Sequence, residues 1–341
     1  MPRELKQKSF TSSLCLLILL AAILIIAAGC DFEFEKEEKG ILPDYRTGYE
    51  GLNMKFVDTP SYDLFENDLF ILQIDFQNKG AYDIDDGVLR INYPSQLLTL
   101  RSEESTREIP ELKGKSFFNP QGGFIEVPEV FDFKAGTVPG EAGIEASVVA
   151  NACYHYKSQA TLLACIGPRM GPGTCNFESL NIDLNLSQGQ GAPLVIERVE
   201  ESISPVDEET SSITFQIEIA NRGEGEVFRY LKSGEDSNID SVCKGIYKFD
   251  SHKPVDVLNA FDFTLQLSTD YKYDSKTKEA TGNVVCQPRL RPPHLESGYT
   301  KIICTISGIK EKTAYKTPLI ITLDYGYRIT DTERVTIKKP R

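Results

Sequence analysis

The chain has 341 residues but no tryptophan and only three histidines, His155, His252 and His294. None of the three lies in a spacing such as H-E-x-x-H or H-x-H, which is typical of metal ligands. The sequence therefore carries no metal or catalytic-triad signature, and we expect no enzyme activity, no catalytic residue, no metal and no cofactor. The lack of tryptophan also disfavours carbohydrate binding.

Positive charge is the second property that the chain has little of. It contains 37 Lys and Arg against 50 Asp and Glu, which gives a formal net charge of −13. The charged residues before the first apolar run contribute +2, so the remainder carries −15; they are Arg3, Glu4, Lys6 and Lys8. Nucleic-acid binding needs clustered Lys and Arg, so we expect no nucleic-acid partner.

A long apolar run spans residues 14–28, between this basic start and an acidic stretch at residues 31–38. Such an order is the pattern of an export signal. As a helix, about 15 residues rise roughly 22 Å, less than the ~30 Å hydrocarbon core of a bilayer. Because positive charge stays on the cytoplasmic side, we expect the rest of the chain on the extracytoplasmic face of the cell membrane. We assign residues 1–30 to a signal or membrane anchor and 31–49 to an acidic spacer.

The apolar run ends in Ala27-Ala28-Gly29-Cys30. This ending resembles a lipobox, in which small residues precede a cysteine that is lipidated and becomes the new N-terminus. A lipobox usually begins with Leu, whereas this one begins with Ala. Lipidation of Cys30 and an uncleaved transmembrane anchor with a cytoplasmic N-terminus are therefore both open, and both place the remainder outside.

The cysteines favour disulfides over thiol or zinc chemistry. Cys15 and Cys30 belong to the N-terminal segment, and six others lie in the exported part: Cys153, Cys165, Cys175, Cys243, Cys286 and Cys304. An even number without a C-x-x-C pair is typical of a disulfide framework in an exported chain. We therefore expect three disulfides.

Strand geometry suggests one set of pairings. A hairpin turning near residues 158–159 would place Cys153 opposite Cys165, and a turn at residues 292–298 would place Cys286 opposite Cys304.

The remaining bridge would join Cys175 to Cys243 and fix two domains against each other. A local Cys165–Cys175 loop is the competing arrangement, and it stays open at this point.

Short runs with apolar residues at every second position, bounded by Gly, Pro, Asn and Asp, fill the exported part. This pattern predicts an all-β fold. The expected strands lie within residues 89–93, 144–156, 213–219, 261–267, 302–306 and 319–327. The stretches 102–140 and 228–259 are expected to be long loops or insertions.

An internal repeat divides the exported part. Residues 72–80 match residues 215–223 in their apolar face, polar face and Asn-x-Gly ending, where we expect glycine to supply a positive φ. A second repeated motif, Tyr-x-Tyr at 154–156 and at 325–327, predicts the start of a terminal hairpin in each copy. The repeats predict two tandem immunoglobulin-like β-sandwich domains at residues 50–190 and 194–338, joined by a Gly/Pro-rich segment that restricts their angle.

The apolar-x-apolar-x-apolar-x-Asn-x-Gly pattern of residues 72–80 and 215–223 resembles cell-surface β-sandwich modules of the CARDB type. With the N-terminal membrane segment and the six cysteines, the arrangement is similar to that of archaeal surface proteins. The resemblance implies an adhesion or presentation role, and it covers little of the chain.

Three polar features are candidate sites. The acidic turn at residues 83–87 departs from a calcium loop and is interpreted as solvated. His155 is interpreted as an outward-facing surface residue, and Tyr154, Tyr156, Tyr325 and Tyr327 as core residues in preference to a platform for sugar or peptide. Asn185 lies in an N-glycosylation sequon.

Two hypotheses for function follow. The first is a membrane-anchored structural or adhesion protein that contacts a protein partner at the cell surface. The second is a lipoprotein that binds a glycan, peptide or metal in a pocket formed by residues 102–140 and 228–259.

Overall fold

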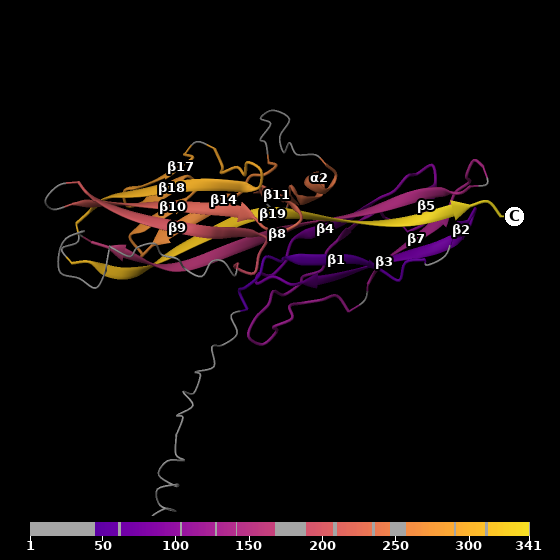
Figure 1. Cartoon of the computed structure of the whole chain (residues 1–341), viewed down its shortest axis with the longest axis horizontal. Helices are drawn as coiled ribbons and strands as arrows, with labels where there is room; N and C mark the ends of the chain where they lie inside the picture. Colours follow the sequence, from indigo (N-terminus) through magenta and orange to yellow (C-terminus); the bar gives the residue numbers. More distant parts are fainter. Residues whose placement is uncertain are drawn as a thin grey trace, which may run out of the picture. The chain divides into compact units, whose positions relative to one another are not determined.

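A computed structural model describes residues 45–60, 63–102, 104–126, 128–140, 142–167, 189–206, 210–233, 236–245, 257–289, 291–310 and 313–340. By its contacts, the chain from Asp44 to Arg341 is one compact unit (Figure 1). The predicted anchor at residues 1–30, with Cys15 and Cys30, lies outside the described residues, as do Cys175, Asn185 and His252. Within the described ranges, no helix is long and apolar enough to cross a membrane.

The described chain is almost entirely β-structure, which confirms the predicted all-β class. Two sheets have four strands each. The first has the order β1 (Leu52–Val57), β3 (Leu69–Asn78), β7 (Glu129–Ala135) and β5 (Leu98–Leu100). The second has the order β9 (Leu194–Pro205), β10 (Ser211–Asn221), β18 (Tyr299–Ile309) and β17 (Val284–Gln287).

A third sheet has nine strands and is shared by both halves of the molecule. Its order is β16 (Glu279–Thr281), β15 (Tyr271–Asp274), β14 (Asp262–Leu267), β19 (Tyr315–Lys338), β8 (Ile144–Ile166), β4 (Gly87–Asn92) and β6 (Thr106–Glu108). Two further strands, β2 (Leu64–Phe65) and β11 (Glu226–Phe228), pair with β19. A small pair, β12 (Lys232–Ser233) and β13 (Asp236–Ser237), precedes the short helix α2 (Ile239–Cys243).

The two long strands of the shared sheet, β8 and β19, pair antiparallel without interruption. The ladder begins at Ile144 opposite Ile337 and ends at Ile166 opposite Tyr315. Along β8 every even-numbered residue from Ala146 to Ile166 is buried, because alternation places all of them on one face. One face of a single strand therefore contributes to the core of both halves.

Each half is a two-layer lobe that takes a segment of both long strands. The first lobe comprises the first four-stranded sheet, β4, β6, residues 144–154 of β8 and residues 327–338 of β19. The second lobe comprises the second four-stranded sheet, β14–β16, residues 156–166 and residues 315–325. In Figure 1 the first lobe is on the right and the second on the left.

The two terminal hairpins expected from the Tyr-x-Tyr segments are wrong. Ser158 and Gln159, read as a turn, lie in the middle of β8 opposite Leu323 and Thr322. Ser158 is buried and its hydroxyl is bonded to the carbonyl of Leu194, so a polar residue that resembled a turn signal is satisfied inside a strand. The two predicted domain ranges consequently share their last strands.

The two lobes repeat one topology. The orders β1-β3-β7-β5 and β9-β10-β18-β17 correspond strand by strand, and in the shared sheet β4 pairs with β8 as β14 pairs with β19. The predicted repeat coincides with the second strand of each sheet, β3 and β10. All of its predicted inward residues are buried, namely Leu72, Ile74, Phe76, Phe215, Ile217 and Ile219.

The stretch 102–140, expected to be a long loop or insertion, contains regular strands. It contains β6 and β7, and β7 lies between β3 and β5 with Phe131 and Phe133 fully buried. The Phe133 ring meets Tyr93, which follows β4, at 5.3 Å, so β7 helps to join the two layers of the first lobe. The alternation pattern did not predict β7 because its run of alternating residues is short and follows a long polar stretch.

Candidate functional site at the junction of the two lobes

Four tyrosines form a buried cluster where the lobes meet. Tyr154 lies opposite Tyr327 and Tyr156 opposite Tyr325 across the β8–β19 ladder, with ring centroids 5.5–6.3 Å apart. Burial raises the pKa of Tyr154 and Tyr325 well above the ordinary value, and raises that of Tyr327 to about 12. The four side chains are buried, so the neutral rings are core residues, as predicted.

The hydroxyl groups of this tyrosine cluster make the same contacts twice. The Tyr156 hydroxyl donates to Asn78 Oδ1 at 3.2 Å, and the Tyr327 hydroxyl donates to Asn221 Oδ1 at 3.0 Å. Both asparagines also donate through Nδ2 to a backbone carbonyl four residues on. The Asn-x-Gly corner of each repeat is thus bonded to the tyrosine of its own closing strand.

The glycines of these corners have a different role from the predicted one. Neither Gly80 nor Gly223 has a positive φ. Instead, a Cβ atom would lie 1.9 Å from the Tyr156 hydroxyl at position 80 and 2.3 Å from the Tyr327 hydroxyl at position 223. Glycine is required there because the tyrosine oxygen approaches the backbone too closely for a side chain.

The opposite face of the junction is covered by a cap of described residues of the second lobe, at 228–233, 236–245 and 257. The buried side chains of the cap form a small second core together with Cys153 of β8. Those of the cap are Phe228, Tyr230, Ile239, Val242, Cys243 and Val257. Gly326 makes room for it, because a Cβ atom there would lie 2.0 Å from the Phe228 ring. The predicted insertion is therefore folded onto the shared sheet.

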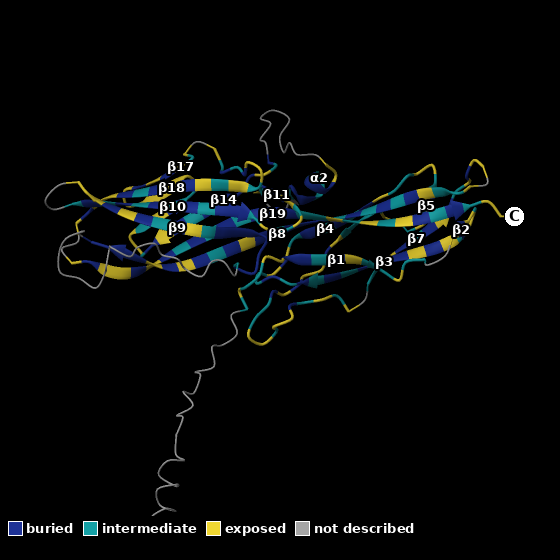
Figure 2. Cartoon of the chain, viewed as in Figure 1, coloured by how far each residue is buried: buried dark blue, intermediate teal, exposed yellow. Residues whose placement is uncertain are grey.

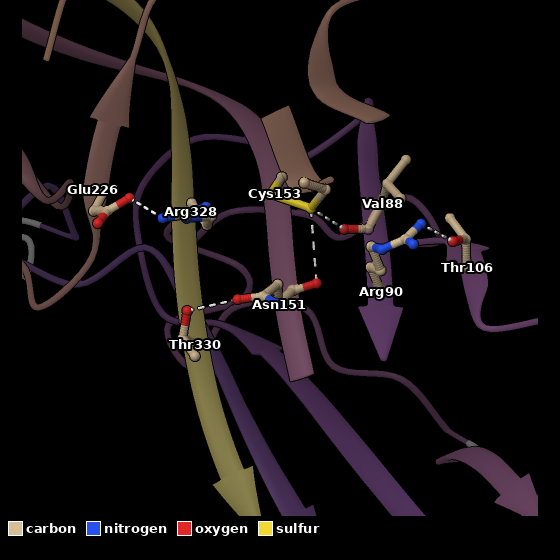
Figure 3. The surroundings of a disulfide bond; sticks show 9 residues. Val88, Arg90, Thr106, Asn151, Cys153, Glu226, Arg328 and Thr330 are labelled. Carbon is tan, nitrogen blue, oxygen red and sulfur yellow. Dashed lines mark hydrogen bonds and ion pairs between the residues drawn. A yellow bond between two sulfur atoms is a disulfide. The ribbon is translucent and has the colours of Figure 1, made fainter. Parts of the chain in front are cut away.

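A disulfide between Cys153 and Cys243 attaches the cap to β8 (Figure 3). The Cys243 sulfur lies 3.5 Å from the carbonyl oxygen of Val88 on β4 and 3.8 Å from that of Asn151 on β8. The expected Cys153–Cys165 and Cys175–Cys243 pairings are wrong. Without the hairpin, Cys153 and Cys165 lie far apart along one strand.

The other cysteines agree better with expectation. Cys286 and Cys304 are bonded across directly opposite positions of β17 and β18, which confirms that pairing. Cys165 is disulfide-bonded as well. Its partner is not among the described residues, so the competing Cys165–Cys175 arrangement stays a prediction.

His155, at the centre of the junction, is not the exposed residue expected. Its side chain is 14% exposed and stacks on Tyr230 of the cap, with 4.0 Å between centroids. Its Nε2 atom lies 3.2 Å from Asp324 Oδ1. Burial alone would raise the pKa of Asp324, but the hydrogen bond and charge of His155 hold it below its usual value. The histidine thus joins the cap to the shared sheet.

The acidic turn at residues 83–87 does not converge on a cation. Asp83 accepts hydrogen bonds from the Gly114 backbone and from Lys113, and Asp86 accepts one from the Tyr230 hydroxyl. Asp83 and Asp86 are therefore used by different protein donors, and the exposed Asp85 carboxylate lies 3.8 Å from His155 Nδ1. In the part of the chain that the structure describes, no group of three or more His, Cys, Asp or Glu could hold a metal ion.

An open groove of about 660 Å³ lies beside the junction in the first lobe. Its lining includes four basic side chains, which is unusual in a chain of net charge −13: Arg46, Lys113, Lys115 and Lys157. Asp83 and Asp85 also line it, together with Tyr45, Tyr82 and Tyr156. The groove uses part of the predicted 102–140 pocket wall, but its lining includes no residue of 228–259.

Sequence reasoning missed the groove and the cap. The only signal for either was the Tyr-x-Tyr echo, whose two copies meet at the junction. No protein-family model matches the chain, and no curated protein matches it.

Proposed function

We propose that the chain is a non-catalytic contact protein of the extracytoplasmic face, anchored by its N-terminal segment and carrying two immunoglobulin-like β-sandwiches as one rigid body. The observation that supports this most is the unbroken β8–β19 ladder, which runs through both lobes. A ladder of this kind extends roughly 75 Å at about 3.3 Å per residue. Such a body suits a spacer that presents a surface to a protein partner.

The proposed attachment and the absence of turnover have separate support. The apolar run at residues 14–28 and the charge asymmetry around it favour membrane attachment with the lobes outside. The hydroxyl groups of the four clustered tyrosines are bonded to asparagine side chains and backbone groups, which favours a structural role for them. The likeness of residues 72–80 and 215–223 to surface modules of the CARDB type points to the same class of function.

Protease treatment of intact cells that make the chain tests this proposal. We expect the lobes to be reached from outside and the chain to stay with the membrane after an alkaline wash. Recovery of the intact chain from the cytosol would overturn the proposal.

The junction groove supports a second candidate, the binding of an anionic ligand. Its four basic side chains favour a carboxylate- or phosphate-bearing molecule over a cation. A saturable thermal shift with an acidic oligosaccharide or inorganic phosphate, lost in Lys115→Ala, would support it. A flat response to both probes would exclude it.

A further inference from the structure

The loop between β6 and β7 exposes three phenylalanines. Phe117 is 53% exposed, Phe118 93% and Phe124 66%. The rings of Phe117 and Phe118 touch edge to face, with 5.2 Å between centroids. In Figure 2 this loop extends away from β1 and is coloured as exposed at its tip. Single exposed apolar residues are ordinary, but a cluster of large ones typically marks a docking surface.

The loop is held in one shape by backbone contacts. The Lys115 N–H donates to the Gly80 carbonyl and the Asn78 N–H donates to the Gly123 carbonyl, both at 2.7 Å. Gly122 has φ +75°, and a Cβ atom there would lie 1.8 Å from the Asn78 carbonyl oxygen. The phenylalanines are therefore presented by a fixed turn against the Asn-x-Gly corner.

The described chain begins next to this loop. Tyr45 and Arg46 line the junction groove together with Lys115, Ser116 and Asn119, so the chain leaves towards its N-terminus beside the aromatic tip. Between the expected anchor and this point lie residues 31–44. Fully extended, these fourteen residues span at most roughly 50 Å. The surface of a bilayer that holds the anchor therefore lies at most roughly 50 Å from Tyr45, which is beside the loop.

One basic side chain beside the phenylalanines fits a lipid surface. Lys115 precedes Phe117 by two residues, whereas Lys113 is already paired with Asp83 and Glu111. Phenylalanine side chains enter the boundary between headgroups and acyl chains, and a nearby lysine favours anionic lipid.

We propose that Phe117, Phe118 and Phe124 dock into the surface of the bilayer that carries the chain's own anchor. This inference rests on the membrane attachment proposed above. The rings would enter to the boundary between headgroups and acyl chains, roughly 5–10 Å deep. Docking at a second point would fix how the lobes stand on the membrane.

The absence of tryptophan allows a direct test. The full chain is reconstituted into phospholipid vesicles as Phe118→Trp and, separately, as Phe65→Trp. Phe65 is 44% exposed on β2, which pairs with the distal end of β19 at Ile337 and Lys338. We expect Trp fluorescence at position 118 to be quenched by bromine on the lipid acyl chains and shielded from iodide in water, with the reverse at position 65.

The outcomes separate this inference from the one on which it rests. A chain that does not float with the vesicles contradicts the membrane attachment itself. A chain that floats but has equal iodide quenching at both positions overturns the docking alone. Shielding at position 118 without quenching by brominated lipid would also overturn it, because a protein contact would then cover the loop.

Discussion

Tyr154 of β8 lies directly opposite Tyr327 of β19, with 6.0 Å between their ring centroids. The pair joins the closing strand of one repeat to the closing strand of the other. Tyr154 receives a hydrogen bond from the Leu52 N–H of the first lobe, and Tyr327 receives one from the Gly225 N–H. These two hydrogen bonds each stay within one repeat, whereas β8 and β19 continue past the tyrosines into the other lobe. Each lobe is therefore completed by residues from the other repeat.

The tyrosine hydroxyls should contribute measurably to stability. Tyr156→Phe and Tyr327→Phe each leave the Asn-x-Gly corner without its buried donor, so each should lower the free energy of unfolding by about 1–2 kcal/mol. Urea denaturation gives the values. Tyr93→Phe is the matched control, because its ring packs on Phe133 away from both corners. Equal effects in all three variants would contradict the role of the hydroxyls.

Removing the end of the chain should unfold the first lobe. A stop after Arg328 deletes the buried Val335 and Ile337, which pair with β8. Losing two such side chains costs roughly 3 kcal/mol or more, so exchange protection of Leu52–Val57 should fall about 100-fold or more. Hydrogen exchange with mass spectrometry measures this.

A stop after Lys338 keeps the whole ladder and serves as the control for the truncation. Unchanged protection of β1 in the shorter chain would mean that the first lobe does not need β19.

The disulfides should differ in how much they stabilise the fold. Cys153 and Cys243 close a loop with a sequence separation of 90, whereas Cys286 and Cys304 are separated by 18. Chain-entropy arguments predict that replacing the first pair by alanines costs about 1 kcal/mol more than replacing the second. Calorimetry of the two double variants checks this. Non-reducing peptide mapping should recover the Cys153–Cys243 peptide, and a Cys153–Cys165 peptide would refute the strand arrangement.

Stability should depend on pH through Glu201. This residue of β9 is 8% exposed, and both carboxylate oxygens lie 3.1 Å from the backbone nitrogen of Cys165 on β8. Burial raises the pKa of Glu201 from 4.5 to about 7, although the hydrogen bond from Cys165 opposes this.

The native state therefore binds this proton more tightly than the unfolded chain. The resulting stability is fully present below pH 4.5 and is lost as the pH rises to about 7. The loss should be roughly 3 kcal/mol. Glu201→Gln should remove that slope and make the protein more stable than the wild type at pH 8, whereas the exposed Glu279→Gln should leave the slope in place. A wild-type slope that persists in Glu201→Gln would assign it to another group.

Local features of the fold could be predicted from the sequence. The strands β3 and β10 alternate apolar and polar residues so regularly that their inward residues were identified correctly. The Cys286–Cys304 bridge followed because its two strands are neighbours in the sequence.

The arrangement of those strands could not be predicted in the same way. Serine is common in turns, so Ser158 resembles a turn signal. The strand continues through it because its buried hydroxyl donates to the carbonyl of Leu194, a contact that the local sequence does not indicate. The partner of Cys153 depends on a cap that comes from a distant part of the chain. The Asn-x-Gly corners were predicted correctly. Their glycines are needed because a tyrosine hydroxyl approaches the backbone closely, and nothing in the neighbouring sequence indicates that contact.

The measurement that tests the central claim most directly is the distance between the two lobes. Spin labels on unnatural residues at Thr99 of β5 and Val285 of β17, both exposed, would leave the disulfides intact. Because β8 and β19 run through both lobes, pulsed electron paramagnetic resonance should give one narrow distance distribution. A broad or bimodal distribution would show that the lobes move independently, and would contradict the shared-strand account.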